Sequence, residues 1–317
     1  MKVLVTGSTG LVGSALLRVL SDGGHIVDRL VRSSPGDEGG GGRWDPEAGI
    51  LDPGGPGGHE AVVHLAGENI AGAPWTPERK ARIRDSRVNG TRLLCEYLHR
   101  LERPPETLVC ASAVGYYGDR GNEVLREESP PGKGFLAGVC REWEEATGEA
   151  ARKGVRVVNL RIGMVLSADG GALGKMLPAF RAGVGGRIGS GKQYASWIAL
   201  SDLVGVILHV LATNSLTGPV NAVAPQPVTN REFTKTLGRV LGRPAIALLP
   251  AFAARFLFGE MADELLLAST RVEPAKLLAS GYRFRFPELE GALRCLLGRG
   301  DPAGLDRKEQ EPQQVDS

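Results

Sequence analysis

The chain has few cysteines, and they follow no pattern that would bind a metal. Its 317 residues include only Cys95, Cys110, Cys140 and Cys295, with no C-x-x-C pair and no histidine at ligand spacing. A zinc site and a disulfide framework are therefore both unsupported, and we expect no metal. Widely spaced free cysteines fit a reducing compartment.

A large excess of one charge is also missing. Lys and Arg number 38 against 36 Asp and Glu, which gives a formal net charge of +2. Near neutrality does not favour nucleic acid or an anionic membrane as the main partner. No apolar run is long enough to cross a bilayer, and because strand residues start at Val3 we expect no signal segment. We expect a cytoplasmic protein without a nucleic-acid or membrane partner.

The first fourteen residues predict a strand, a glycine turn and the start of a helix. Val3-Leu4-Val5 leads into the segment 6–13, TGSTGLVG, and apolar residues at helical spacing follow. In this context Gly7 allows a sharp turn, Gly10 lets backbone N–H groups approach a pyrophosphate, and Gly13 lets the helix pack on the sheet. The N–H groups and the helix dipole then hold the anion. The predicted dinucleotide-binding residues here are Gly7, Thr9, Gly10, Leu11, Val12 and Gly13.

The second predicted strand, residues 26–31, ends where such proteins bind the ribose. An acidic residue about 20 positions beyond the glycine turn would accept hydrogen bonds from the 2′-hydroxyl of NAD. Arg32 and Ser33 stand there instead. A guanidinium suits a 2′-phosphate, so we predict NADP, with both residues in its site. The alternative is a solvated arginine after a strand; Asp28 comes too early to bind the ribose.

Further strands and helices alternate along the chain. Buried strands are expected at 61–69, 107–111 and 155–161, with helices at 75–98 and 135–153, and a long irregular loop at 34–60. This order predicts an α/β fold, a Rossmann-like doubly wound parallel sheet with a smaller C-terminal substrate lobe. We expect an NADP-binding domain at 1–165, a substrate lobe at 166–297 that partly returns to the core, and a disordered tail at 298–317.

Two of these segments contribute further candidates. The strand 61–69 ends in small residues, which places Leu65, Ala66 and Gly67 beside the cofactor. The helix 75–98 carries five basic residues, of which Arg82 and Arg87 are candidates for an anion clamp. The alternative is that these charges are simply a solvated helix face.

A turn rich in hydroxyl groups follows the strand 107–111. In a parallel sheet the carboxyl ends of strands face the ligand crevice, so Ser112, Tyr116 and Tyr117 are candidate catalytic residues over the cofactor. Packing alone is the alternative role of the two tyrosines.

Several segments together resemble a known family. They include the glycine turn, residues 65–70 (LAGENI), Ser86-Arg87, 112–118 (SAVGYYG), Trp143-Glu144, 189–191 (GSG), 196–198 (SWI), 221–230 and 281–289. The chain resembles the extended or atypical short-chain dehydrogenase/reductases of the NAD-dependent epimerase/dehydratase superfamily, from Met1 to about Leu297. Within it, the chain is most similar to the branch called epimerase family protein, some bacterial members of which carry a cell-division-inhibitor label. The resemblance implies that Arg32, Leu65, Ala66, Arg82, Arg87 and Val165 line the cofactor site.

The chain departs from this family at the catalytic helix. Redox-active members carry a Tyr-x-x-x-Lys pair there, in which tyrosine moves the substrate proton and lysine holds the ribose. Alignment on Glu144 puts Leu136 at the tyrosine position and Cys140 at the lysine position. The assisting serine is displaced too, since Ala113 stands at its place and Ser112 one residue earlier. Cys140 as a nucleophile lacks a nearby histidine, and buried free cysteines commonly only pack.

Two functions follow as hypotheses. The first is an NADP-dependent oxidoreductase or epimerase with an unknown small-molecule substrate, which uses Tyr116, Tyr117 or Ser112. The alternative is a non-catalytic NADP-binding sensor or interaction protein, as Leu136 and Cys140 suggest. The superfamily suggests a homodimer by analogy.

Overall fold

The computed structural model describes residues 1–32, 42–54 and 57–299. The central sheet and its helical layers consist of β1 (Lys2–Thr6), α1 (Leu11–Asp22), β2 (Ile26–Val31), β3 (Gly42–Asp45), β4 (Ile50–Asp52), β5 (Ala61–His64), α2 (Pro77–Arg100), β6 (Thr107–Ala113), α3 (Phe135–Glu145), α4 (Gly148–Arg152), β8 (Arg156–Ile162), α6 (Leu200–Ala212) and β13 (Gly218–Ala222). Within the described residues the sheet has eight strands in the order β13-β8-β6-β5-β1-β2-β3-β4. Neighbouring strands are parallel except β3 and β4. The predicted doubly wound parallel sheet is thus confirmed.

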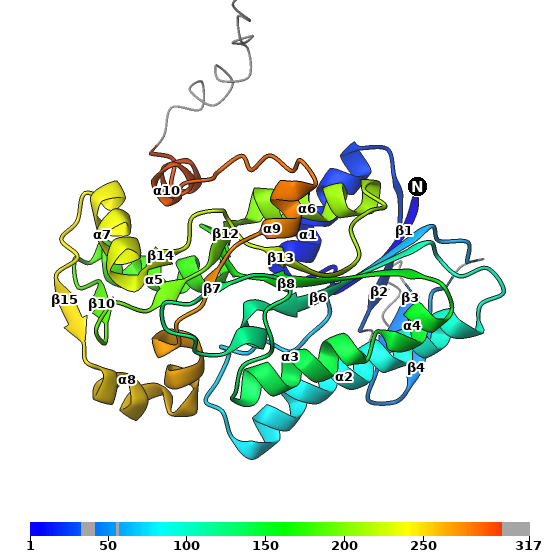
Figure 1. Cartoon of the computed structure of the whole chain (residues 1–317), viewed down its shortest axis with the longest axis horizontal. Coiled ribbons are helices and arrows are strands. Elements are labelled where there is room, and N and C mark those ends of the chain that lie inside the picture. The colour runs from blue at the N-terminus through cyan, green and yellow to red at the C-terminus, as the bar shows by residue number, and fades with distance from the viewer. Residues whose placement is uncertain (33–41, 55–56, 300–317) are drawn as a thin grey trace, which may run out of the picture.

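The central strands are apolar on both faces because helices cover both faces. Val3 and Val5 of β1 face one core cluster, shared with α1 and α6, whereas Leu4 faces another, shared with α2, α3 and α4. All three side chains have no exposed surface. Figure 1 shows the two helical layers, with α1 and α6 above the sheet and α2, α3 and α4 below it. A continuous apolar run, and not an alternating one, is what such a strand requires.

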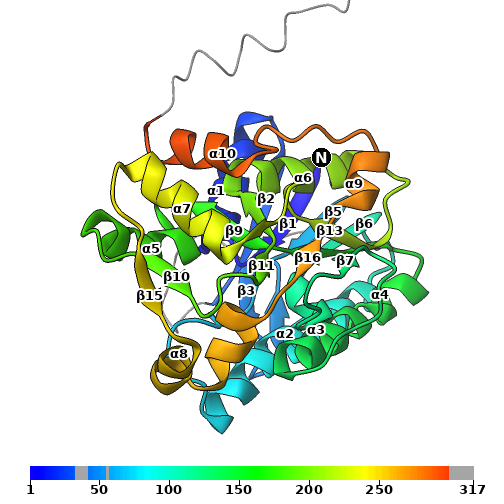
Figure 2. The same cartoon turned by 60° about the vertical axis from the view of Figure 1, so that its left-hand side comes forward.

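The other elements form connections and a second lobe. They are η1 (Val114–Tyr117), β7 (Val124–Leu125), β9 (Met164–Ser167), α5 (Gly171–Arg181), β10 (Gly186–Ile188), β11 (Tyr194–Ala195), β12 (Trp197–Ala199), β14 (Val228–Thr229), α7 (Asn230–Leu241), β15 (Ala247–Leu249), α8 (Ala251–Phe258), η2 (Ala262–Leu267), β16 (Arg271–Val272), α9 (Ala275–Ala279) and α10 (Leu289–Leu296). The lobe has a core of its own, in which Trp197, Leu237 and Leu293 are fully buried. Figure 2 shows α5, α7, α8 and β15 at one end of the molecule.

The chain crosses between the lobe and the sheet more than once. β13 and α6 come from the second half of the sequence, yet β13 pairs with β8 and α6 packs on α1. The short strand β16 pairs with β7, which ties residues 271–272 to 124–125. A domain boundary at residue 165 stays a prediction.

Two predictions about local structure were wrong. In the described part of 34–60, β3 and β4 form a hairpin on the edge of the sheet, and Trp44 of β3 is buried against α2. The helix expected at 135–153 is two helices, α3 and α4, and Thr147 at the break donates its hydroxyl to Glu144 O at 2.6 Å. Ser33 and all but the first two residues of the predicted tail lie outside the described residues.

Candidate functional site

The candidate site begins at the point where the strand order reverses. β1 lies between β2 and β5, and the chain leaves the β1–β2 side of the sheet to build β5, β6 and β8 on the other. Ligands of open α/β sheets bind outside the carboxyl ends of the strands at such a point. The glycine turn follows β1 there, and Leu65, Ala66 and Gly67 follow β5.

The glycine turn lies directly against the segment after β5. Gly7 has φ +68°, and a Cβ on it would lie 2.6 Å from Leu65 C and 2.8 Å from Ala66 N. A Cβ on Gly13 would lie 2.2 Å from Gly7 O. Both positions therefore exclude any side chain, as the sequence pattern predicted. α1 starts after Gly10, which caps it without a side chain, and its first turn has no acidic residue.

β9, which contains Val165, also lies near the start of α1. A Cβ on Gly171 would lie 3.3 Å from Leu11 Cδ2 and 3.4 Å from Val165 O. Leu11, at the start of α1, and Val165 therefore lie in one neighbourhood. Thr9 and Gly10 are exposed, and Val12 is half-buried.

The three candidate arginines differ in their surroundings. Arg87 lies against the segment after β5, since a Cβ on Gly67 would lie 3.2 Å from its Cζ. It donates to Ile83 O at 3.0 Å, its guanidinium stacks over Trp143, and burial lowers its pKa. Arg82 lies on an exposed part of α2, and Arg32 is exposed just after β2. Of the three, Arg87 is the one that packs against the segment after β5.

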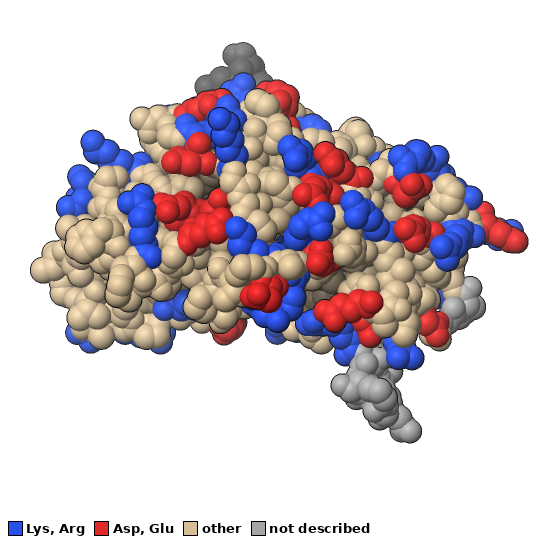
Figure 3. Space-filling model, turned by 90° about the horizontal axis from the view of Figure 1, so that it is seen from below, with Lys and Arg blue, Asp and Glu red and all other residues tan. Residues whose placement is uncertain are grey.

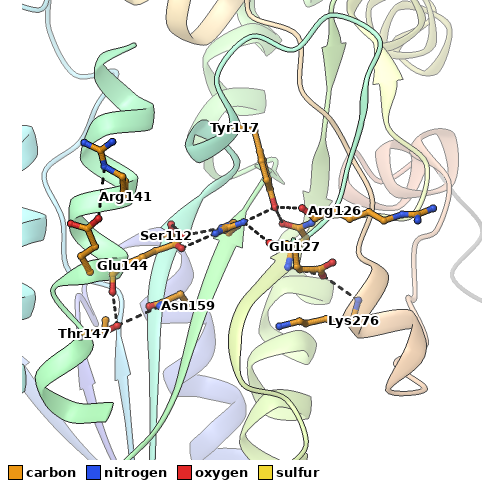
Figure 4. Close-up of polar contacts among 12 residues, drawn as sticks. Ser112, Tyr117, Arg126, Glu127, Arg141, Glu144, Thr147, Asn159 and Lys276 are labelled. Carbon is orange, nitrogen blue, oxygen red and sulfur yellow. Dashed lines mark hydrogen bonds and ion pairs between the residues drawn. The ribbon is translucent and has the colours of Figure 1, made fainter. Parts of the chain in front are cut away.

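A buried polar network lies beneath the hydroxyl-rich turn (Figure 4). Ser112 Oγ donates to Glu144 Oε1 at 2.7 Å. Arg161, at the end of β8, donates to both carboxylate oxygens of Glu144, Nε at 2.9 Å and Nη2 at 2.8 Å. Burial opposes the charge on Arg161, but these bonds raise its pKa. The ion pair between Arg161 and Glu144 links β8 to α3. Ser112, in β6, adds a hydrogen bond to the same carboxylate.

The two tyrosines occupy different places in this network. Tyr117 is fully buried; its hydroxyl donates to Asn221 Oδ1 at 2.7 Å, lies 3.0 Å from Arg126 O, and accepts from Arg161 Nη1 at 2.9 Å. Burial raises the pKa of Tyr117 to about 12. Tyr116 is half-buried, and the Arg161 guanidinium lies 3.5 Å from its ring centroid.

The positions of the missing Tyr and Lys face η1. A Cβ on Gly115 would lie 3.4 Å from Leu136 Cβ and 3.9 Å from Cys140 Sγ. Both side chains are buried, at 8% and 3% exposure, and burial raises the pKa of the Cys140 thiol to about 11. A thiol this weakly acidic is neutral near pH 7, which argues against Cys140 as a nucleophile.

A cavity of about 270 Å³ lies between η1 and the C-terminal segment. Gly115 and Gly118 contribute one side of it, and Arg255, Asp263 and Glu264 contribute to the other. Arg255 and Asp263 form an ion pair at 2.9 Å. Glu264 accepts from the N–H groups of Phe135 and Leu136 at 2.9 and 3.1 Å, so its carboxylate caps the N-terminus of α3.

Comparison with known proteins identifies the family. Residues 3–222 match the NAD dependent epimerase/dehydratase family. The chain belongs to this family. The epimerase family protein Mb2239 of Mycobacterium bovis is 44% identical over 291 residues, which are 92% of this chain and 96% of that protein. The crystal structure of the human epimerase family protein SDR39U1 with NADPH has a TM-score of 0.86 at 37% identity, over 94% of this chain and 99% of that one. A nucleoside-diphosphate sugar epimerase from Corynebacterium glutamicum has a TM-score of 0.76 at 37% identity, over 99% of this chain and 63% of that one.

This member of the epimerase/dehydratase family carries a second matched region. Residues 249–296 match a domain of unknown function, DUF1731. That region supplies six residues of the cavity wall, namely Arg255, Asp263, Glu264, Leu267, Ala268 and Thr270. The wall opposite the hydroxyl-rich turn is therefore built by the C-terminal region.

Some residues of the site were not predicted from the sequence. Arg161 is a charged residue near the end of a buried strand, between Leu160 and Ile162, a signal that was present in the sequence. Glu264 gave no such signal, because it lies 128 positions from its partner Leu136. Within the described ranges, no cluster of His, Cys, Asp and Glu has the arrangement of a metal site, and no helix has the length and apolarity to cross a membrane.

Proposed function

We propose that this protein is an NADP-dependent oxidoreductase or epimerase that acts on a small molecule bound beside η1. The dinucleotide would lie over the carboxyl ends of β1 and β5, beside the turn after β1 and the segment after β5. The observation that carries the proposal is the close packing of the glycine turn after β1, where a side chain at Gly7 or Gly13 would overlap backbone atoms. The NADPH in the crystal structure of the human relative supports the choice of cofactor.

The residues present fit a dinucleotide. Gly10 leaves the first N–H groups of α1 without a side-chain cap, and an anion at a helix N-terminus is stabilised by those groups and by the helix dipole. Ser8 Oγ, in the same turn, is buried and has no hydrogen-bond partner among the described residues. Buried polar groups are normally satisfied, so an open hydrogen bond here fits a polar ligand.

Two arginines would hold the charged groups of the cofactor. Arg87 lies against the segment after β5; burial lowers its pKa, and the charge of Glu68, which pairs with Arg79, opposes that shift only in part. A buried guanidinium is costly unless an anion compensates it, which favours a contact with the cofactor. Arg32, at the end of β2, would bind the 2′-phosphate and select NADP over NAD.

Tyr116 is the best candidate for the proton donor. Of the three candidate hydroxyl groups, those of Ser112, in β6, and Tyr117, in η1, are already bonded inside the protein, whereas that of Tyr116 has no hydrogen-bond partner in the described chain. When bound, a nicotinamide cofactor supplies the hydride chemistry. Tyr116 would orient a carbonyl and protonate the developing alkoxide, a role that favours reduction.

Binding and turnover test this function separately. Calorimetry on the purified chain should detect NADPH binding and weaker NADH binding. A spectrophotometric screen of NADPH oxidation against aldehydes and ketones should then detect turnover. Absence of binding to both nucleotides would refute the proposal as a whole. Tight NADPH binding with no turnover on any carbonyl would refute the enzymatic part alone.

A non-catalytic NADP sensor is the second candidate. It is favoured by one observation, that the positions of the family's Tyr-x-x-x-Lys pair hold buried Leu136 and Cys140, packed against η1. A sensor must bind a partner with different affinities in its NADPH and NADP forms, since a ligand shifts an equilibrium only by its differential affinity. Equal partner affinities in the two forms would eliminate this function.

A further inference from the structure

The end of the C-terminal lobe exposes a group of large apolar side chains. Phe252 and Phe256 on α8 are 75% and 89% exposed, and Ile246, just before β15, is 88% exposed. The complete group, here called the lobe tip, is Val184, Ile246, Leu248, Phe252, Phe256, Leu257 and Phe258. Soluble monomers rarely leave so many large apolar residues together in water, and such patches usually mark an interaction site.

These residues belong to adjoining elements. β15 pairs with β10, and α8 follows β15 after one residue. A Cβ on Gly183 would lie 3.6 Å from Pro244 Cγ, which brings Val184 close to the segment that carries Ile246. Figures 1 and 2 both show β15 and α8 at the same outer edge of the molecule. The elements that carry the lobe tip therefore adjoin one another along that edge.

The same edge is positively charged. Residues 171–258 contain nine Lys and Arg but only two acidic residues, of which Asp202 is 2% exposed and Glu232 caps α7. Two of the nine, Arg239 and Arg255, form ion pairs with Glu290 and Asp263 outside that range. In Figure 3 the left-hand end of the molecule is mostly apolar or uncharged, with basic side chains at its margin. The net charge of +2 for the whole chain conceals this local excess.

Three arginines, two of them from this range, line one cavity. Arg181, Arg243 and Arg299 surround a space of about 520 Å³ near the C-terminal ends of α5, α7 and α10. None of the three has an acidic partner among the residues that the structure describes. Part of their charge offsets the helix dipoles, each about half an elementary charge. The three arginines carry more positive charge than the three helix C-termini offset. The cavity therefore has a net positive charge, which suits a phosphate group.

We propose that the lobe tip docks this protein on the surface of a bilayer that contains anionic phospholipid. Aromatic and aliphatic side chains would enter the boundary between headgroups and acyl chains, and the arginine-lined cavity would bind a lipid phosphate. This combination of an apolar face and basic residues is what holds proteins in the interfacial plane. A second copy is a less suitable occupant, because pairing two lobe tips would bring like charges together.

Flotation with lipid vesicles tests this proposal on the full chain. Vesicles of phosphatidylcholine alone are compared with vesicles that contain about 30% phosphatidylserine. We expect binding to the anionic vesicles only, weakened at high salt because surface charges are screened. Phe252→Ser/Phe256→Ser should lower the affinity by about 10-fold or more, since burial of each ring is lost. Arg181→Gln/Arg243→Gln should lower it by about 5-fold for each charge removed.

Matched variants control for nonspecific effects. Leu278→Ser/Ile26→Ser removes two exposed apolar side chains elsewhere, and Arg18→Gln/Arg103→Gln removes two exposed charges elsewhere. Both should bind vesicles like the parent chain. Circular dichroism on every variant verifies the fold. No preference for anionic vesicles would overturn the proposal, as would self-association in sedimentation experiments that Phe252→Ser/Phe256→Ser abolishes.

Discussion

Tyr116 and Tyr117 are neighbours in sequence, but their hydroxyl groups differ in what surrounds them. Tyr117 is bonded to Asn221 and Arg161, whereas Tyr116 meets Arg161 only through its ring. We therefore expect Tyr116→Phe to lower kcat by about 100-fold or more with NADPH affinity unchanged. Tyr117→Phe should instead lower the free energy of unfolding by about 1–3 kcal/mol, because it leaves buried polar partners unsatisfied. Steady-state kinetics and urea denaturation separate the two roles, and equal loss of kcat in both variants would contradict them.

Arg32 allows a second test at the level of a single side chain. Arg32→Glu should weaken NADPH binding by about 10-fold or more, since it removes a charge-assisted bond to the 2′-phosphate and adds a repulsive charge. NADH binding should change little. Arg18→Gln, an exposed arginine of α1, is the control. An equal loss of affinity for both nucleotides, measured by calorimetry, would show that Arg32 does not read the phosphate.

The structural roles of individual residues were predictable where backbone sterics determine which residue type can occupy a position. Gly7 and Gly13 were assigned to the turn from their spacing, and each lies where a Cβ would overlap backbone atoms. The environments of Ser112 and Tyr117 were not predictable in the same way. Their partners, Glu144 and Asn221, lie 32 and 104 positions away, and no local pattern encodes such distant contacts.

At the level of elements, the N-terminus of α3 depends on a carboxylate from another part of the chain. Glu264 of η2 accepts from Phe135 N and Leu136 N, and the helix has no side-chain cap of its own. Glu264→Ala should therefore lower the free energy of unfolding by about 0.5–2 kcal/mol, the usual cost of a lost cap.

The neighbouring carboxylate is a matched control for this cap. Asp263 forms an exposed pair with Arg255, so Asp263→Ala should change the stability by less than about 0.5 kcal/mol. Chemical denaturation measures both variants. Equal effects would mean that the bonds to α3 contribute nothing beyond an ordinary surface charge.

Helix boundaries were predictable when the cap is local. Thr229 and Glu232 form a capping box that starts α7, and their spacing of three residues is the Thr-x-x-Glu pattern of such a box. Other ends depend on tertiary structure, as at α3, whose N-cap is Gly134 and whose acceptor comes from η2. The break between α3 and α4 was not predicted, although Thr147 and Gly148, which have low helix propensity, lie there.

For the molecule as a whole, a buried histidine predicts how stability depends on pH. His64 is fully buried between Thr6 and Thr91, and burial lowers its pKa from 6.5 to about 4. As the pH falls below about 6.5, the unfolded chain binds a proton at this histidine and the folded chain does not. Stability is therefore complete above that pH and decreases as the pH falls toward 4.

Between pH 6.5 and 5, His64 alone should reduce the free energy of unfolding by about 1.5 kcal/mol. This window lies above the range in which most carboxylates titrate. Urea denaturation at several pH values measures the slope, and His64→Gln should flatten it. An unchanged slope in that variant would assign the dependence to other groups.

The topology of the sheet was predictable because apolar strands alternate with helices along the chain. The edge hairpin of β3 and β4 was not, since its sequence is rich in glycine, proline and acidic residues. The cavity near η1 was also beyond sequence reasoning, because residues from 115 to 270 meet there. Contacts between distant segments are fixed by the assembled fold and leave no periodic signal.

The late position of β13 in the sequence affects how the chain matures during synthesis. β8 ends at Ile162, but the strand that covers its outer edge begins only at Gly218. During synthesis, the outer edge of β8 therefore stays unpaired until the segment that contains β13 has left the ribosome. An uncovered strand edge is a template for pairing with another nascent chain. A truncated product that stops near residue 165 would keep that edge permanently and should precipitate during expression.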